Sequence, residues 1–400
     1  MRYRHISVAV PALAEIGNLP DFIESLRRQS LSDFSIYICV NNPEGWDCDG
    51  DDSHRSMFID NQKSVEYLHG IENELDLCMI DRSSAGHGWN GKQQGVGWAR
   101  KTIFDHIAST HDDNELIVSL DADTAFNDTY LESVLSAMNS HQEHSALCVP
   151  YYHPLSGNDT DDRAMLRYEI YMRHYFISLS ESRNPYAFTA LGSAMVFPLW
   201  AYHRVGGITP LQGGEDYYLM QKFAKTGKIL QSCDSVVYPQ GRVSHRVPFG
   251  TGPAIAKGID AMDNSYPLYS HKGFDAVAKT YALFPRLYDE EIETPMSAFL
   301  RQQLKTDNLW TPLRKNFKSR ELFTHACAER VDGLRILQFL KTFPTLSAEE
   351  ELSVFCQQHN ISLPPDFDFR QTGINNICSL RDVLFDHEMF LRDRNDHLCE

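Results

Sequence analysis

The sequence predicts an α/β fold, a mostly parallel sheet flanked by helices, followed by a mainly helical C-terminal region. Short apolar runs rich in valine and isoleucine alternate with segments of helical periodicity in the earlier part of the chain. Polar or acidic residues follow several of these runs directly. From residue 273 onward the helical patterns continue without alternating strands. Such an alternation of strands and helices is typical of a parallel sheet with right-handed crossovers.

The expected elements follow in chain order. Strands are expected at residues 6–11, 34–40, 75–80, 115–120, 146–150, 194–198 and 235–238. Helices are expected at residues 15–31, 56–70, 92–107 and 161–180, and from residue 213 onward. In open sheets of this kind ligands bind beyond the carboxyl ends of the strands, so the residues there are the first candidates for a site.

Composition and charge restrict the functional classes. The 400 residues carry a net charge of −17, which argues against a general nucleic-acid-binding surface. No apolar run approaches the roughly 18 residues of a transmembrane helix, and residues 1–5 show no signal-peptide pattern. Nine cysteines without a CxxC pair suit reduced thiols. We expect a cytoplasmic protein. A basic group at residues 314–320 is either a solvated helix face, the more common case, or a contact for anionic lipid or glycan, which leaves a peripheral position at the inner membrane face open.

The strand expected at residues 115–120 leads directly into Asp121-Ala122-Asp123. Two carboxylates at the exposed end of a buried strand can hold a divalent cation that also binds phosphate oxygens. Carboxylates buried there without a partner or a metal would lower the stability of the fold. The alternative is an ordinary helix start, because Asp123 or Thr124 could cap a helix through residues 130–131.

Residues 86–93, GHGWNGKQ, nearly match the phosphate-binding pattern GxxxxGK[ST]. They predict an anion site at the start of the helix expected at residues 92–107, where Lys92 either contacts phosphate or is simply solvated. Gln93 replaces the hydroxyl that binds magnesium in that pattern, and the segment follows the third strand instead of the first. A P-loop nucleoside triphosphate hydrolase is therefore an alternative function.

A second acidic segment is Gly213-Gly214-Glu215-Asp216, at the start of an expected helix. The glycines allow close approach of a substrate. One of the adjacent acids can orient an acceptor hydroxyl while the other removes its proton. An ordinary helix start with an acidic first turn is the alternative.

His245 and Arg246 follow the last expected strand. A neutral imidazole can ligate a metal, and a guanidinium can face phosphate. A single histidine is more often structural, so this assignment depends on the other motifs.

Taken together and in this order, these motifs resemble glycosyltransferase family 2. The strand ending at Pro11, Asp121-Ala122-Asp123, the glycines before Glu215-Asp216, and His245 carry the resemblance, and residues 193–207 are also similar to that family. It covers roughly residues 5–255 and implies a GT-A fold with a Rossmann-like mixed sheet. We therefore expect a glycosyltransferase domain at residues 1–265 and a helical C-terminal region at residues 266–400.

The resemblance implies roles for individual residues. Those expected to contact the nucleotide sugar are Pro11, Ala12, Glu15, Asn42, Lys92, Asp121, Ala122 and Arg246. Asn42 falls where the family often has an aspartate that faces the base, so the identity of the base stays open. Those expected to hold Mn²⁺ or Mg²⁺ are Asp121, Asp123 and His245. Asp216 would be the catalytic base, and Gly213, Gly214 and Glu215 would bind the acceptor.

The reaction that the resemblance implies is metal-dependent transfer of a sugar from a nucleotide-diphosphate donor to a hydroxyl of a glycan or another acceptor. A single displacement with inversion is expected, with retention left open. A non-catalytic glycan-binding module on a transferase fold is a further alternative, beside the P-loop hydrolase. The donor sugar, the acceptor and the oligomeric state are left open.

Overall fold

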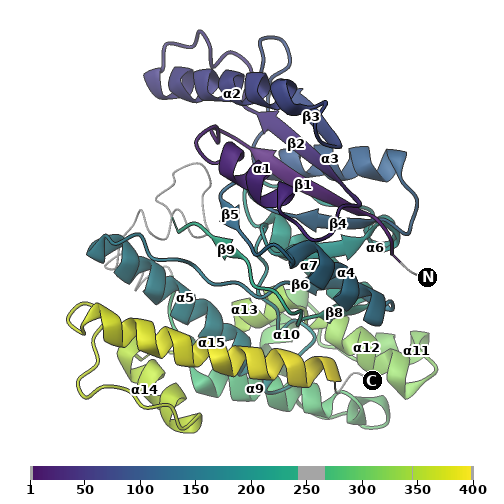
Figure 1. Cartoon of the computed structure of the whole chain (residues 1–400). Helices are drawn as coiled ribbons and strands as arrows, with labels where there is room; N and C mark the ends of the chain where they lie inside the picture. Colours follow the sequence, from purple (N-terminus) through teal and green to yellow (C-terminus); the bar gives the residue numbers. More distant parts are fainter. Residues whose placement is uncertain (1–2, 242–265, 345, 398–400) are drawn as a thin grey trace. The chain divides into compact units, whose positions relative to one another are not determined.

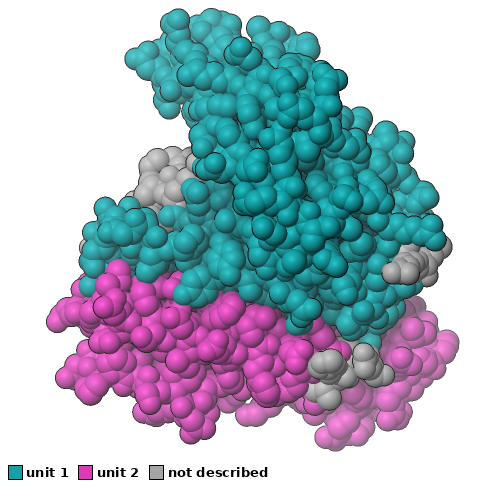
Figure 2. All heavy atoms as spheres, viewed as in Figure 1, with its two compact units in different colours: residues 1–165, 189–256, 400 teal, residues 166–188, 257–399 magenta. Residues whose placement is uncertain are grey.

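The computed structural model describes residues 3–241, 266–344 and 346–397 (Figure 1). The chain forms two compact units, which Figure 2 distinguishes by colour. The described residues of unit 1 fall within 1–165 and 189–256, and those of unit 2 within 166–188 and 257–399. The expected domain boundary after residue 265 stays a prediction, because residues 242–265 lie outside the described part.

Unit 1 contains a seven-stranded sheet with the strand order β3-β2-β1-β4-β7-β6-β8. Its strands are β1 (Ile6–Ala12), β2 (Phe34–Asn41), β3 (Leu77–Arg82), β4 (Leu116–Ser119), β6 (His144–Cys148), β7 (Met195–Pro198) and β8 (Lys228–Leu230). Strands β1 to β4 are parallel, whereas β7 runs antiparallel to both β4 and β6. This is a Rossmann-like mixed sheet, so the predicted α/β fold class with a mostly parallel sheet is confirmed.

Helices connect most of these strands. They are α1 (Leu19–Arg27), α2 (Asp52–Ile71), α3 (Val96–Thr110), α4 (Tyr130–Ser140), α6 (Leu199–Arg204) and α7 (Glu215–Thr226), while α5 (Asp159–Ser180) runs from unit 1 into unit 2. All residues of β4 are buried, and in β1 only Pro11 is partly exposed. Burial on both faces explains the continuous apolar sequence of these two central strands.

The parallel strands give the sheet two chemically distinct edges. We call the edge where β1 to β4 end the C-terminal edge, and the edge where they begin the N-terminal edge. Just beyond the end of β4, β5 (Thr124–Ala125) pairs antiparallel with β9 (Tyr238–Pro239) in a separate two-stranded sheet. This pairing holds the backbone immediately after Asp123.

Several helices begin at other residues than expected. The helix expected at residues 15–31 is α1, which spans only Leu19–Arg27. The helix expected from residue 92 begins at Val96, because Gly91 and Gly95 have φ angles of 61° and 89° and keep the chain in a turn. The helix expected from residue 56 begins at Asp52, because the side chain of Asp51 accepts hydrogen bonds from the first backbone amides.

The regular secondary structure in the described residues of unit 2 is helical, in agreement with the predicted helical C-terminal region. Besides part of α5 it contains α9 (His271–Leu283), η1 (Arg286–Tyr288), α10 (Ser297–Leu304), α11 (Thr311–Asn316), α12 (Arg320–Arg330), α13 (Gly333–Leu340), α14 (Ala348–Gln358) and α15 (Ile374–His397). No helix in the described part of the chain combines the length and apolar character that crossing a bilayer requires.

A buried ionic network joins α5 to α15 within unit 2. Nη1 of Arg173 donates to Glu388 (2.6 Å), which also accepts from Nε of Arg392 (2.8 Å), and Arg173 pairs with Glu169 on its own helix. All four side chains are at most 1% exposed. Because removing one partner would leave a buried charge uncompensated, this network strongly favours one register between the two helices.

Candidate active site

The chain turns immediately after β4. The amide of Thr124 donates to the carbonyl of Asp121 (3.0 Å), and the side chains of Asp121 and Asp123 are partly exposed while Ala122 is buried. The expected alternative of a helix cap here is wrong, because α4 begins only after Thr129. Both carboxylates thus lie in a turn at the C-terminal edge.

A buried arginine links this turn to the start of α7. Arg100, on α3, donates through Nη2 to Oδ1 of Asp121 (2.6 Å) and through Nη1 to Oε1 of Glu215. Its side chain is 4% exposed, that of Glu215 is 2% exposed and that of Asp121 is 38% exposed. Burial disfavours the charged guanidinium, but the two carboxylates outweigh this effect and raise the pKa of Arg100. Arg100 is therefore a permanent cation between two acids.

The loop before β7 leaves room for this guanidinium. A Cβ atom at Gly192 would overlap the guanidinium of Arg100, so a larger residue requires one of them to move. The Ser119 hydroxyl donates to the carbonyl of Gly192 (2.7 Å) and holds the loop against β4.

Arg100 is the site residue that the sequence analysis missed. It lies on the buried face of α3, near Ala99 and Ile103, which are both fully buried. An arginine on an apolar helix face rarely stays buried without an acidic partner. An arginine among the apolar positions of the expected helix was therefore the sequence signal that could have identified Arg100 as a site residue.

The acidic pair of the second segment lies in the first turn of α7. Gly214 precedes the helix with a left-handed φ of 77°, a conformation that glycine adopts without strain. Asp216 is partly buried, and its Oδ1 accepts a hydrogen bond from the amide of Tyr217 (2.7 Å). Burial, and then the charge of Glu215, raise the pKa of Asp216 to about 7. Such a carboxyl group can exchange a proton near neutral pH.

The residues present fit a divalent cation in the chemistry of their donors. Asp121 and Asp123 offer carboxylate oxygens, which Mg²⁺ and Mn²⁺ prefer. Asp121 and Glu215 share the guanidinium of Arg100, and Asp216 adds a further carboxyl group beside Glu215. A divalent cation would offset negative charge from these acids. Within the described ranges, no three His, Cys, Asp or Glu side chains converge at this turn. The expected third ligand, His245, and the expected phosphate contact, Arg246, lie outside the described residues.

Four of the expected nucleotide contacts lie at the end of β1 or in the loops after β1 and β2. Pro11 and Ala12 end β1, and Oε2 of the buried Glu15 accepts from Asn18 (2.7 Å). Oδ1 of the buried Asn42 accepts from Asn61 on α2 (2.8 Å). Hydrogen bonds of amide and carboxylate side chains therefore stabilise the loops at the C-terminal edge. The nucleotide-binding roles of these residues stay predictions.

The glycine-rich turn is filled by a side chain of the protein itself. The amides of Gly86 and Gly88 donate to the two carboxylate oxygens of Glu44 (2.9 and 2.8 Å). Lys92 is exposed in the following turn, four residues before α3 begins at Val96. The expected anion site at the start of this helix is thus wrong in its geometry, because Glu44 occupies the amides. This arrangement also argues against the P-loop alternative.

Comparison with known proteins gives weak similarity to solved structures. No protein-family model matches the sequence, and no curated protein matches it. The structure of TarS residues 1–349 from S. aureus in complex with UDP-GlcNAc matches with a TM-score of 0.43 and 12% identity, covering 82% of this chain and 91% of that one. The mannosyltransferase PcManGT from Pyrobaculum calidifontis, in complex with GDP-Man and Mn²⁺, matches with a TM-score of 0.41 and 12% identity, covering 97% and 86%.

Proposed function

We propose that the chain transfers a sugar from a nucleotide-diphosphate donor to a hydroxyl group of a glycan or another acceptor. The main support is the ion-pair network in which Arg100 joins Asp121, at the end of β4, to Glu215, at the start of α7. It brings the two acidic motifs of the sequence together at the edge where α/β sheets bind ligands. Next to it lies Asp216, whose pKa of about 7 suits a general base.

In this proposal Asp121 and Asp123 hold Mn²⁺ or Mg²⁺ against the donor diphosphate. When bound, the cation supplies positive charge that offsets the charge of the leaving diphosphate. Arg100 fixes the carboxylate of Asp121 and holds Glu215 in place beside Asp216. The permanent guanidinium charge also reduces the repulsion between these acids and an anionic donor.

The transfer itself is a single displacement. Asp216 accepts the proton of the acceptor hydroxyl, whose oxygen forms a bond to the anomeric carbon of the donor sugar. The bond from that carbon to the phosphate oxygen breaks at the same time, and the nucleoside diphosphate leaves with the electron pair. Attack from the face opposite the leaving group inverts the anomeric centre.

The test is Asp216→Asn, which removes the proton acceptor and keeps the size of the side chain. We expect transfer to fall by roughly 10²- to 10⁴-fold, the usual contribution of a general base, while nucleotide diphosphate binding changes little. Turnover over a panel of sugar nucleotides with Mn²⁺, beside isothermal titration of the nucleotide, measures both. Transfer that persists near the wild-type rate would contradict the role of Asp216.

The alternatives give different results in the same assay. Glycan binding without turnover of any donor would favour a non-catalytic module. Hydrolysis of ATP that depends on Lys92, without binding of any sugar nucleotide, would favour the P-loop hydrolase.

A further inference from the structure

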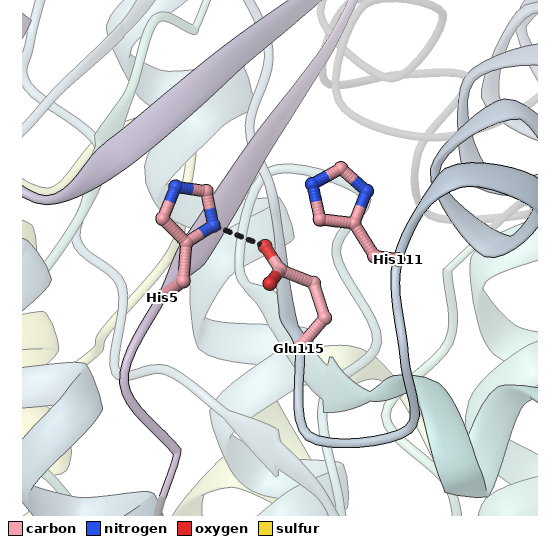
Figure 3. A group of neighbouring side chains, drawn as sticks. All are labelled: His5, His111 and Glu115. Atoms are coloured by element: carbon pink, nitrogen blue, oxygen red, sulfur yellow. Dashed lines mark hydrogen bonds and ion pairs between the residues drawn. The ribbon is translucent and has the colours of Figure 1, made fainter.

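The N-terminal edge of the sheet carries a second cluster of ionisable side chains. His5 precedes β1, Glu115 precedes β4, and His111 follows α3. One ligand atom from each lies within 4.8 Å of the others. Figure 3 shows the two imidazole rings on either side of the Glu115 carboxylate. Strands β1 and β4 are neighbours, so the sheet itself brings two of the three residues together.

Hydrogen bonds from the surrounding side chains restrict the orientation of these groups. Nε2 of His5 is 3.2 Å from the Ser35 hydroxyl, which itself donates to Asp76. A proton on Nε2 therefore points to Ser35 and leaves Nδ1, 2.7 Å from Glu115, as the ligand atom. The Ser7 hydroxyl donates to the same oxygen of Glu115 (2.6 Å) and fixes the carboxylate.

The second imidazole is oriented by the end of its helix. Nδ1 of His111 lies 3.3 Å from the carbonyl of Ile107 and 2.9 Å from the Thr110 hydroxyl. When Nδ1 carries the proton, Nε2 is the ligand atom. The C-terminus of α3 also places partial negative charge beside the cluster, which favours a cation.

The cluster opens into a cavity of about 750 Å³. Asp76, Asp112 and Glu115 line it together with a single arginine, Arg4, so acidic groups exceed permanently charged basic ones. Glu115 itself is 5% exposed, whereas His5 and His111 are partly exposed toward solvent. An ion bound by the three residues would therefore keep room for water or a small ligand on the cavity side.

We propose that His5, His111 and Glu115 bind Zn²⁺ at the N-terminal edge, with a fourth coordination position open to the cavity. Two imidazoles and one carboxylate are a donor set that Zn²⁺ favours, unlike the all-oxygen sets preferred by Mg²⁺. Ligand atoms around tetrahedral Zn²⁺ lie about 3.3 Å apart. Small rotations of these side chains therefore suffice. The site is separate from the Asp121 turn and does not depend on the proposed transferase activity.

The experiment uses the full-length chain, stripped with a chelator and titrated with Zn²⁺ by calorimetry and with Co²⁺ by visible absorption. We expect wild type to bind one ion with the intense bands of a low-coordinate histidine site. His111→Ala should lose this ion, and Ser35→Ala should bind it about tenfold more weakly because His5 loses its orienting partner. His106→Ala, near the end of α3 but outside the ligand set, is the matched control and should bind normally.

Two further variants separate other sites from this one. Asp123→Ala removes one carboxylate of the turn at the C-terminal edge, and His387→Ala disrupts a second group in unit 2, Glu181, His359 and His387. Neither change should remove the ion. If His111→Ala does not fold, Glu115→Gln serves as the test instead. It keeps the shape of the Glu115 side chain and should also lose the ion. A wild type that binds no Zn²⁺, or equal binding by the His111 and His106 variants, would overturn the proposal.

Discussion

The two edges of the sheet in unit 1 both carry acids beside a basic group, but the basic groups differ. At the C-terminal edge Arg100 is a permanent cation that cannot ligate a metal, and it acts there as a hydrogen-bond donor to two carboxylates. At the N-terminal edge His5 and His111 can be neutral and can donate a lone pair. The comparison indicates that one edge suits an anionic substrate with an oxygen-bound cation, while the other suits a metal bound partly through nitrogen.

The largest expected effect is on stability at the C-terminal edge. Arg100→Leu leaves Glu215 buried without its partner, and breaking such a pair costs about 3 kcal/mol, the lower end of the usual range because Asp121 stays 38% exposed. Urea unfolding measures this loss. Arg27→Leu, which breaks an exposed pair with Glu74, is the control and should cost less than about 1 kcal/mol. Equal losses would show that the Arg100 network is not a special feature of this edge.

Donor binding should be the next most sensitive property. Asp123→Ala removes a carboxylate of the proposed cation site, so we expect nucleotide diphosphate to bind roughly ten- to a hundredfold more weakly in Mn²⁺, the range for a lost charged contact. Calorimetry with and without Mn²⁺ measures this. Asp128→Ala, an exposed acid just after the turn, should bind normally. Unchanged binding by the Asp123 variant would remove the metal role from this turn.

The pH dependence of transfer should report on Asp216. Its pKa is raised to about 7 by burial first and by the charge of Glu215 second, so below that pH the base is largely protonated and inactive. Glu215→Gln removes the second cause and lowers the pKa. The acidic limb of kcat/KM should then move to lower pH. A limb that stays in place, or moves to higher pH, would contradict the coupling between the two acids.

The smallest effect is expected at the N-terminal edge without metal. His111 lies partly exposed at the end of α3, so His111→Ala in the chelated protein should cost less than about 1 kcal/mol in unfolding free energy. The measurement is the same urea titration. A loss as large as that of Arg100→Leu would mean that the imidazole is mainly structural, and the contrast between the edges would disappear.

Much of the fold was predictable, because buried strands such as β1 and β4 carry continuous apolar sequences between clear turn signals. Strand β8 was not predicted, since three residues give too short a pattern. The start of α3 was placed too early, because the positive φ of Gly95 depends on the folded loop and not on local sequence alone. Apolar periodicity thus determines the presence of an element better than its limits.

The candidate site was predictable only in part. The carboxylates at residues 121, 123, 215 and 216 were identified from their motifs, and the structure links two of them through Arg100. Arg100 itself was missed because its partners are distant along the chain and only the strand order brings them together. The hydrogen bonds from the glycine-rich turn to Glu44 were also not predicted, because Glu44 is more than 40 residues away along the chain.

In the glycine-rich turn at residues 86–91, the carboxylate of Glu44 takes the position of an anionic ligand. This carboxylate satisfies the same backbone donors that would otherwise receive an oxyanion, and Gly88 allows the close approach because a Cβ atom there would meet the backbone of Glu44. The backbone amides of Gly86 and Gly88 therefore have a hydrogen-bond acceptor without any bound solute. Without the side chain of Glu44, the amides of Gly86 and Gly88 would lose this acceptor, so a single residue determines whether these donors are available to a solute.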